Sequence, residues 1–146
     1  MFIEALIPTA REKLVTIGEG APLIEAAELL SSGSDIVLVC NNDGVLAGIV
    51  TKTDVVRQIS HCQGASCTCP LATVMTRDVV SCRGQDALAE VSQRMMERHL
   101  KNIPVVDSNE RPLGVLTARA ILRVLLGDAE FDEAQLMDYV KGVGYR

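Results

Sequence analysis

The amino-acid sequence predicts an α/β (α+β) fold made of two tandem β-α-β-β-α units that pack as a pseudo-twofold pair. The first observation is an internal repeat, because residues 15–60 resemble residues 80–126 in the order and kind of their amino acids. The second is that apolar residues in both stretches change from helical spacing to short continuous runs, which are typical of buried strands. One unit of this size buries little surface by itself, so we expect the two to pack together.

The repeat divides the 146 residues into four parts. Residues 1–61 are the first repeat with an N-terminal lead-in (unit one), and residues 73–127 are the second repeat (unit two). A cysteine-containing linker, residues 62–72, joins them. Residues 128–146 form a helical tail, in which the spacing of apolar residues over Phe131–Lys141 predicts an amphipathic helix.

Unit one carries the residues that begin and end its elements in the expected order. Pro22 lies near a helix start and Gly33 stops that helix, whose predicted inward positions are Ile24, Ala27 and Leu30. A polar turn then joins two apolar runs as a hairpin. The predicted elements are an extended segment Leu14–Ile17, a helix between Pro22 and Gly33, strands Ile36–Cys40 and Val45–Thr51, and a helix over residues 54–59.

Unit two repeats this order. Asp86 is a favoured N-cap residue, and Leu88, Val91 and Met95 follow at the spacing of one buried helix face. The predicted elements are an extended segment Val79–Cys82, a helix after Asp86, strands Ile103–Val106 and Leu113–Thr117, and a helix over residues 118–126.

Pro104 interrupts the strand-like run of unit two. Proline cannot donate a hydrogen bond to a ladder, so we expect the strand to be open or at a sheet edge there. An open backbone edge can receive a heteroaromatic ring. Unit one has Leu38 at the equivalent position.

Composition excludes several classes of protein. The chain has 14 Lys and Arg against 19 Asp and Glu, a net charge of −5 and 3% aromatic residues, which argues against nucleic-acid binding. No apolar run approaches the length of a membrane span, and Glu4 stands where a signal peptide carries positive charge. Five cysteines, an odd number, fit a reducing compartment. We therefore expect a cytoplasmic protein with neither nucleic acid nor membrane as a partner.

The doubled pattern resembles a CBS-domain pair, also called a Bateman module. The resemblance rests on Gly48–Asp54 in unit one, Lys101–Asp107 in unit two and the lead-in Val74–Thr76, and it covers most of the chain. It implies a stand-alone regulatory module without enzymatic activity or a required cofactor. Its expected ligand is an adenosyl nucleotide (AMP, ADP, ATP or S-adenosylmethionine, with Mg²⁺ as an accompanying ion) in one cleft between the repeats. It also implies a disc-shaped homodimer and a separate, unidentified protein partner.

The candidate ribose site lies at Thr51, Thr53 and Asp54. Hydroxyls and a carboxylate at a strand-to-helix junction gather short polar groups, and a carboxylate accepts strong hydrogen bonds from sugar hydroxyls. The resemblance assigns the ribose to Asp54. The alternative is that Thr53 or Asp54 simply caps the following helix.

The candidate phosphate site is supplied by unit two. The resemblance places basic residues just before the second repeat's proline-containing strand, and Arg98, His99 and Lys101 occupy that place. Unit two itself has Ala120 where Asp54 stands, and Asp35 of unit one would repel a phosphate. We therefore expect one competent cleft and one degenerate one. The alternative is an ordinary solvated helix end, where cations are favourable.

The candidate adenine contacts are apolar and backbone groups of unit one. The resemblance points to Asp35, Ile36 and Val37 at the start of a strand, with Ile17 as an apolar wall. Plain core packing is the alternative for Ile17.

The linker cysteines and the missing catalytic motifs complete the sequence-based predictions. Cys62, Cys67 and Cys69 are weak metal candidates because their spacing is not that of a zinc knuckle, so we expect structural or redox-sensitive thiols and no metal.

No nucleophile elbow, zinc-protease or P-loop motif is present. The alternative function is a ligand-free dimerisation or interaction module that regulates a partner protein.

Overall fold

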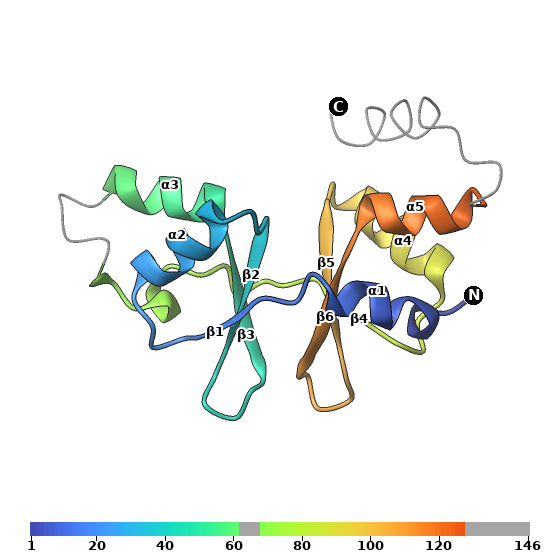
Figure 1. Cartoon of the computed structure of the whole chain (residues 1–146), viewed down its shortest axis with the longest axis horizontal. Helices are drawn as coiled ribbons and strands as arrows, with labels where there is room; N and C mark the ends of the chain where they lie inside the picture. Colours follow the sequence, from blue (N-terminus) through green and yellow to red (C-terminus); the bar gives the residue numbers. More distant parts are fainter. Residues whose placement is uncertain (62–67, 128–146) are drawn as a thin grey trace.

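The chain folds into two halves that stand side by side, each with a three-stranded sheet flanked by helices (Figure 1). The structure, a computed structural model, describes residues 1–61 and 68–127. Its elements are η1 (Ile3–Leu6), α1 (Ile7–Arg11), β1 (Thr16–Gly18), α2 (Leu23–Ser31), β2 (Ile36–Cys40), β3 (Leu46–Thr51), α3 (Lys52–His61), η3 (Leu71–Thr73), β4 (Cys82–Arg83), α4 (Leu88–Glu97), β5 (Asn102–Val106), β6 (Pro112–Thr117) and α5 (Ala118–Leu125).

Each sheet has its middle strand paired on both sides. The strand orders are β1-β2-β3 and β4-β5-β6, with the first pair parallel and the second antiparallel in each. Both faces of β2 are covered, because Val37 and Val39 pack toward the helices of unit one whereas Ile36 and Leu38 join Val115 in a cluster between the units. Burial on both faces explains why the sequence has a continuous apolar run there.

Pro104 lies in the middle strand β5, opposite Val115 of β6. In unit one, Leu38 at the equivalent place donates its N–H to the carbonyl of Val15 at 2.9 Å. Proline has no N–H to give, and the pairing of β4 with β5 begins one residue later, at Cys82 and Val105. The strand is therefore open at Pro104 as the sequence predicts, although β5 is not an edge strand.

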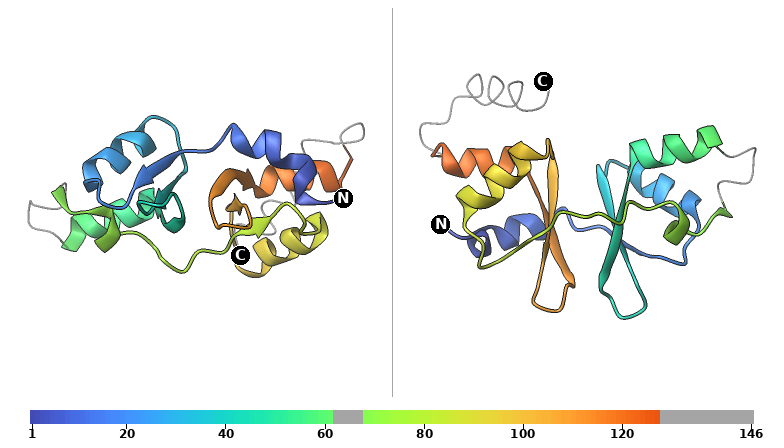
Figure 2. Two further views of the ribbon diagram at one scale, coloured as in Figure 1. Left: turned by 90° about the horizontal axis from the view of Figure 1, so that it is seen from below. Right: turned by 180° about the vertical axis from the view of Figure 1, so that it is seen from behind.

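The two lead-in segments are exchanged between the units. Ile3, Leu6 and Ala10 belong to the buried cluster of unit two, and α1 contacts β6. Leu71 and Met75, which precede unit two in the sequence, belong instead to the cluster of unit one. Figure 1 shows α1 in the half that holds β6, and both views in Figure 2 show two connections crossing between the halves. The core of each unit is thus completed by the segment that precedes the other unit in the sequence.

Glycines permit the lead-ins to approach the sheets. A Cβ on Gly114 would lie 2.4 Å from the backbone carbon of Ala10, and one on Gly48 would lie 2.7 Å from the Met75 sulfur. Only a glycine leaves room for such a close passage of the chain. Gly48 and Gly114 are therefore needed for the exchanged lead-ins to pack against the sheets.

The hairpin tips join the two units at the end remote from the helices. Leu46 donates its N–H to the carbonyl of Glu110 at 2.9 Å, and the Arg111 side chain donates to the carbonyl of Asp43 at 3.2 Å. With the apolar cluster between the sheets, these bonds fix the relative position of the units.

Two local predictions are wrong. The N-cap of α4 is Ala87, because the Asp86 carboxylate instead accepts the N–H of Arg83 in the preceding turn at 2.9 Å. The buried face of α2 is formed by Leu23, Ala26 and Leu30, whereas Ile24 is 45% exposed.

The predicted tail helix over 131–141 and most of the cysteine-rich linker lie outside the described residues. No helix in the described part of the chain is long and apolar enough to cross a membrane.

Candidate functional site

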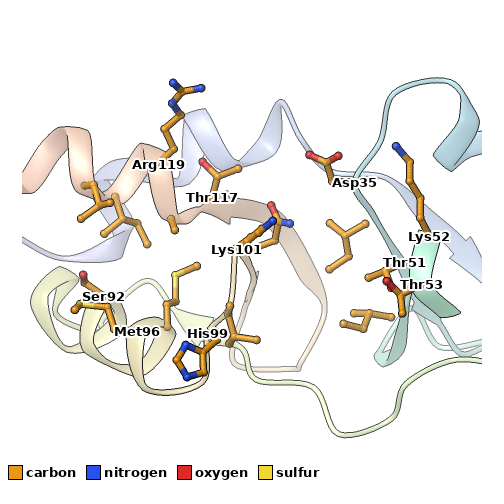
Figure 3. Close-up of a pocket in the computed structure, with 18 residues that line it drawn as sticks. Asp35, Thr51, Lys52, Thr53, Ser92, Met96, His99, Lys101, Thr117 and Arg119 are labelled. Atoms are coloured by element: carbon orange, nitrogen blue, oxygen red, sulfur yellow. The ribbon is translucent and has the colours of Figure 1, made fainter. Parts of the chain in front are cut away.

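A cavity of about 790 Å³ lies between the two units, at the end where both sheets pass into helices. Unit one lines it with the start of β2 and the junction of β3 with α3. Unit two lines it with α4, the connection from α4 to β5, and the junction of β6 with α5. Figure 3 shows the side chains of the two units facing each other across it. Its volume is in the range of sites that bind small molecules.

Six of the ten residues predicted from the sequence line this cavity: Asp35, Ile36, Thr51, Thr53, His99 and Lys101. The other four are not among its lining residues. Ile17 packs against the core cluster of unit one, Val37 is fully buried in that cluster, and Arg98 is an exposed C-cap residue of α4. Asp54, the predicted ribose residue, is 94% buried behind the junction of β3 and α3, since 6% of it is exposed.

The Asp54 carboxylate is already occupied by groups of the protein. One oxygen accepts the backbone N–H of Thr51 at 3.0 Å and its hydroxyl at 3.2 Å. The other accepts the Thr76 hydroxyl at 3.1 Å and pairs with Arg57 at 3.4 Å. The Asp54 N–H also lies 3.4 Å from the Thr51 oxygen, which completes a reciprocal cap at the start of α3. The carboxylate therefore ties α3 to the connecting segment that contains Thr76.

Unit two has half of this arrangement. Thr117 accepts the Ala120 N–H at 3.0 Å, as Thr51 accepts that of Asp54. Ala120 has no carboxylate to return to the Thr117 N–H, so the second cap is not reciprocal. The predicted difference between the repeats at this position is therefore a difference in helix capping.

His99 lies in a backbone conformation that is uncommon for a side-chain-bearing residue, with φ of 55°. It follows the end of α4, where Leu100 donates to the Met95 carbonyl at 2.9 Å and His99 donates to that of Met96 at 3.3 Å. These two bonds form a Schellman motif, in which glycine is usual at the left-handed position. The motif turns the chain toward Lys101 and places His99 at the cavity.

Three cations line the cavity, and two of them were missed by sequence reasoning. Lys52, Lys101 and Arg119 form this basic rim, with Asp35 as the acidic residue among the lining side chains. In Figure 3 Lys101 lies centrally, whereas Lys52 and Arg119 come from the helix starts of opposite units. Lys52 directly follows Thr51, and Arg119 lies two residues after Thr117. Both therefore stand at the strand-to-helix junction of their repeat, which is a signal that could have identified them.

The cavity continues between α4 and α5 as an apolar arm, lined by Ser92, Met95, Met96, Ile121 and Leu122. None of these residues was predicted as a site residue. The helical spacing of Met95 and its neighbours is typical of an ordinary buried face, so the sequence has no signal that separates core from cavity wall.

The described cysteines do not gather with other metal-binding side chains. No group of three or more His, Cys, Asp or Glu that could hold a metal ion occurs within residues 1–61 and 68–127. Burial, together with the nearby Asp86 carboxylate, raises the pKa of the Cys82 thiol to about 12. Burial also raises the pKa of Cys40. Cys62 and Cys67 lie outside the described residues.

Comparison with known proteins identifies a pair of domains of one family. A family model described as the CBS domain matches residues 5–61 and 71–127. A solved CBS-domain-containing protein from Agrobacterium tumefaciens is 26% identical, with a TM-score of 0.71 over 86% of this chain and 99% of its own. A CBS domain pair solved in complex with 5′-methylthioadenosine and S-adenosyl-L-methionine is 22% identical, with a TM-score of 0.70 over 88% of this chain and 98% of its own.

A curated relative is much longer than this chain. A homoserine O-acetyltransferase from Methanococcoides burtonii is 33% identical over 115 residues, which are 78% of this chain and 22% of that protein. The chain thus spans about a fifth of the length of that relative, and the similarity covers the repeats.

Proposed function

Because the chain belongs to the CBS-domain family and carries two of its domains, we propose that it is a regulatory module that binds an adenosyl nucleotide between its units. The ligand class is AMP, ADP, ATP or S-adenosylmethionine. Binding at this place would report the ligand to a partner protein, because both units contribute residues to the cavity.

The observation that carries the proposal is the chemistry of the cavity lining. Hydroxyls of Thr51, Thr53 and Thr117 lie at the two helix starts, and the basic rim supplies cations nearby. Hydroxyls suit a sugar, and cations suit a phosphate or a carboxylate through charge-assisted hydrogen bonds. The neighbour solved with 5′-methylthioadenosine and S-adenosyl-L-methionine supports an adenosyl ligand.

The role of Asp54 in this proposal has a structural condition. A ribose hydroxyl reaches the carboxylate by replacing one of its present partners, either the Thr76 hydroxyl at 3.1 Å or the Arg57 guanidinium at 3.4 Å. Ligand binding that replaces the Thr76 hydroxyl would release the connecting segment from α3, and that release is a means of signalling. A ligand held by Thr51 and Thr53 alone would leave the connection unchanged.

The name of the longer relative supports no enzymatic activity for this chain. Its similarity to this chain lies in the CBS pair, and about four fifths of that protein has no equivalent here. A regulatory role for the pair is consistent with its occurrence beside other sequence in that relative.

The test is a thermal-shift titration with AMP, ADP, ATP and S-adenosylmethionine, each with and without Mg²⁺. A ligand at 100 times its dissociation constant stabilises the native state by about 2.7 kcal/mol. Lys101→Ala should weaken the shift because Lys101 lines the cavity. The matched control is Lys13→Ala, since Lys13 is exposed and does not line the cavity. No shift with any of the four compounds would contradict the proposal.

A second candidate function is a ligand-free interaction module that forms a homodimer. Val56 and Ile59 on α3 are 65% and 59% exposed, and Leu125 and Leu126 at the end of α5 are 44% and 41% exposed. Exposed apolar side chains of this size favour an interface. Sedimentation of Val56→Asp together with Ile59→Asp tests it: this candidate function predicts a monomer, whereas an unchanged molar mass would contradict an interface through α3.

A further inference from the structure

We propose that the basic rim selects the ligand by its negative charge, so that the cavity binds ATP and ADP more tightly than AMP and excludes S-adenosylmethionine. The rim is formed by Lys52, Lys101 and Arg119. This inference rests on the proposed function and narrows its ligand class. It assigns the choice of ligand to Lys52 and Arg119, two residues to which the sequence gave no role.

The rim cations have no anionic partner within residues 1–61 and 68–127. The ion pairs in this part of the chain lie elsewhere and join Arg57 to Asp54, Arg83 to Glu110, and Arg94 to Asp86. The rim side chains also donate no hydrogen bond to another described residue. Unpaired cations that line one cavity repel each other, and an anionic ligand between them removes this repulsion.

The rim spans the two units. Lys52 is the first residue of α3, Arg119 lies in the first turn of α5, and Lys101 directly precedes β5. Figure 3 shows Lys52 and Arg119 on opposite sides of the cavity, with Lys101 placed centrally. A single phosphate contacts part of such a rim, whereas a chain of phosphates extends along it and makes charge-assisted hydrogen bonds to both units. A ligand with more phosphates therefore gains more contacts.

The hydroxyls beside the rim suit the sugar that carries the phosphates. Lys52 stands between Thr51 and Thr53, which both line the cavity, and Arg119 lies two residues after Thr117. Hydroxyls exchange hydrogen bonds with sugar hydroxyls. The phosphate of a nucleotide is attached directly to its sugar, so a sugar at these threonines brings the phosphates to the rim.

Asp35 opposes the rim, as the acidic residue among the lining side chains. Three cations against one carboxylate leave the lining net positive, with histidine counted as neutral. S-adenosylmethionine carries a sulfonium and an ammonium group against one carboxylate, so the net positive lining repels it. Asp35 weakens the attraction for phosphate, and its removal should therefore have the opposite effect to the removal of a rim cation.

The direct test is calorimetric titration of the full chain with ATP, ADP, AMP and S-adenosylmethionine. Mg²⁺ is left out because it neutralises phosphate charge. ATP should bind about tenfold more tightly than AMP or better, and S-adenosylmethionine about a hundredfold more weakly than ATP or worse, since each charged contact contributes about tenfold. The advantage of ATP over AMP should shrink as salt is raised, because ions screen exposed charges.

Charge variants test the assignment to individual residues. Lys52→Gln and Arg119→Gln should each weaken ATP binding by about fivefold to tenfold, and AMP binding by less. Asp35→Asn should tighten ATP binding, a change of sign that a general loss of stability does not produce. The matched control is Lys13→Gln, which should leave ATP binding unchanged because Lys13 is an exposed lysine outside the cavity lining.

The outcomes separate this inference from the function on which it rests. If AMP or S-adenosylmethionine binds as tightly as ATP, the cavity does not select by charge and only the inference fails. The same holds if either Lys52→Gln or Arg119→Gln binds ATP as the wild type does. If the wild type binds none of the four compounds, the proposed function fails and the inference fails with it.

Discussion

Asp54 is the residue at which the sequence and the structure are most usefully compared. The sequence indicates a carboxylate at a strand-to-helix junction, and both the ribose role and the capping role follow from that. The structure has the cap, because Thr51 and Asp54 bond to each other in both directions. The bond to Thr76 had no signal in the sequence, since it depends on how the connecting segment passes β3. The ribose role stays a prediction.

Removing the Asp54 carboxylate should destabilise the protein. Asp54→Ala loses the reciprocal cap and leaves the Thr76 hydroxyl without its partner, so the free energy of unfolding should fall by about 1–3 kcal/mol. Urea unfolding measures this. Asp54→Asn keeps an oxygen acceptor and should lose less. A loss below about 0.5 kcal/mol for Asp54→Ala would mean that these hydrogen bonds contribute little to stability.

His99 carries local backbone strain beside the cavity. A left-handed conformation is unfavourable for residues with a Cβ and is readily adopted by glycine, so His99→Gly should stabilise the protein by about 0.5–1 kcal/mol. The melting temperature of the protein without ligand measures the change. Gly33→Ala is the reverse control, because Gly33 ends α2 at φ 117° and should lose stability. A destabilised His99→Gly variant would show that the imidazole makes a stabilising contact.

At the scale of elements, the repeated pattern predicts the strands well because their residues are apolar on both faces. The predicted strand Ile36–Cys40 coincides with β2, and the predicted strands Val45–Thr51 and Ile103–Val106 differ from β3 and β5 by one residue. The shorter pairing of β4 has its cause in Pro104. The face of α2 was less predictable, since Leu23, Ile24, Ala26, Ala27 and Leu30 fit two overlapping helical faces.

The glycines of the two repeats should differ in how they tolerate a side chain. Gly114→Ala places a Cβ 2.4 Å from backbone of α1, which cannot rotate away, so a loss of more than about 2 kcal/mol is expected. Gly48→Ala should cost less, because its nearest neighbour is the flexible Met75 side chain. Gly18→Ala is the control, with no atom within 4 Å. Equal losses for Gly114 and Gly18, measured by chemical unfolding, would contradict the close approach of α1 to β6.

At the scale of the whole molecule, the sequence predicts that the units pair but not which residues complete each core. The repeat pattern assigns each lead-in to the unit that it precedes. The structure exchanges them, and this exchange places the Thr76 hydroxyl at Asp54 and Ala10 at Gly114. The cavity has the same origin, because its walls come from both units and its apolar arm depends on the spacing of α4 and α5. Such placements depend on tertiary packing, which local patterns do not encode.

The exchange of lead-ins predicts a crossed response to core mutations. Ile3 is fully buried in the cluster of unit two, and Leu71 is fully buried in that of unit one. Ile3→Ala and Leu71→Ala should each cost about 2–5 kcal/mol. Hydrogen exchange measured by mass spectrometry should show Ile3→Ala lowering amide protection in β5, β6 and α5, and Leu71→Ala lowering it in β2 and β3.

The two variants are controls for each other, because both remove a large aliphatic side chain of similar burial from a lead-in. If each variant instead lowered protection in the unit that it directly precedes in the sequence, the exchanged packing would be wrong. A crossed response would mean that neither repeat keeps its core when the other is removed. A signal received in the cavity would then reach both units through the lead-ins. Thr76, which precedes unit two in the sequence, contacts Asp54 of unit one, and Ala10, which precedes unit one, contacts Gly114 of unit two.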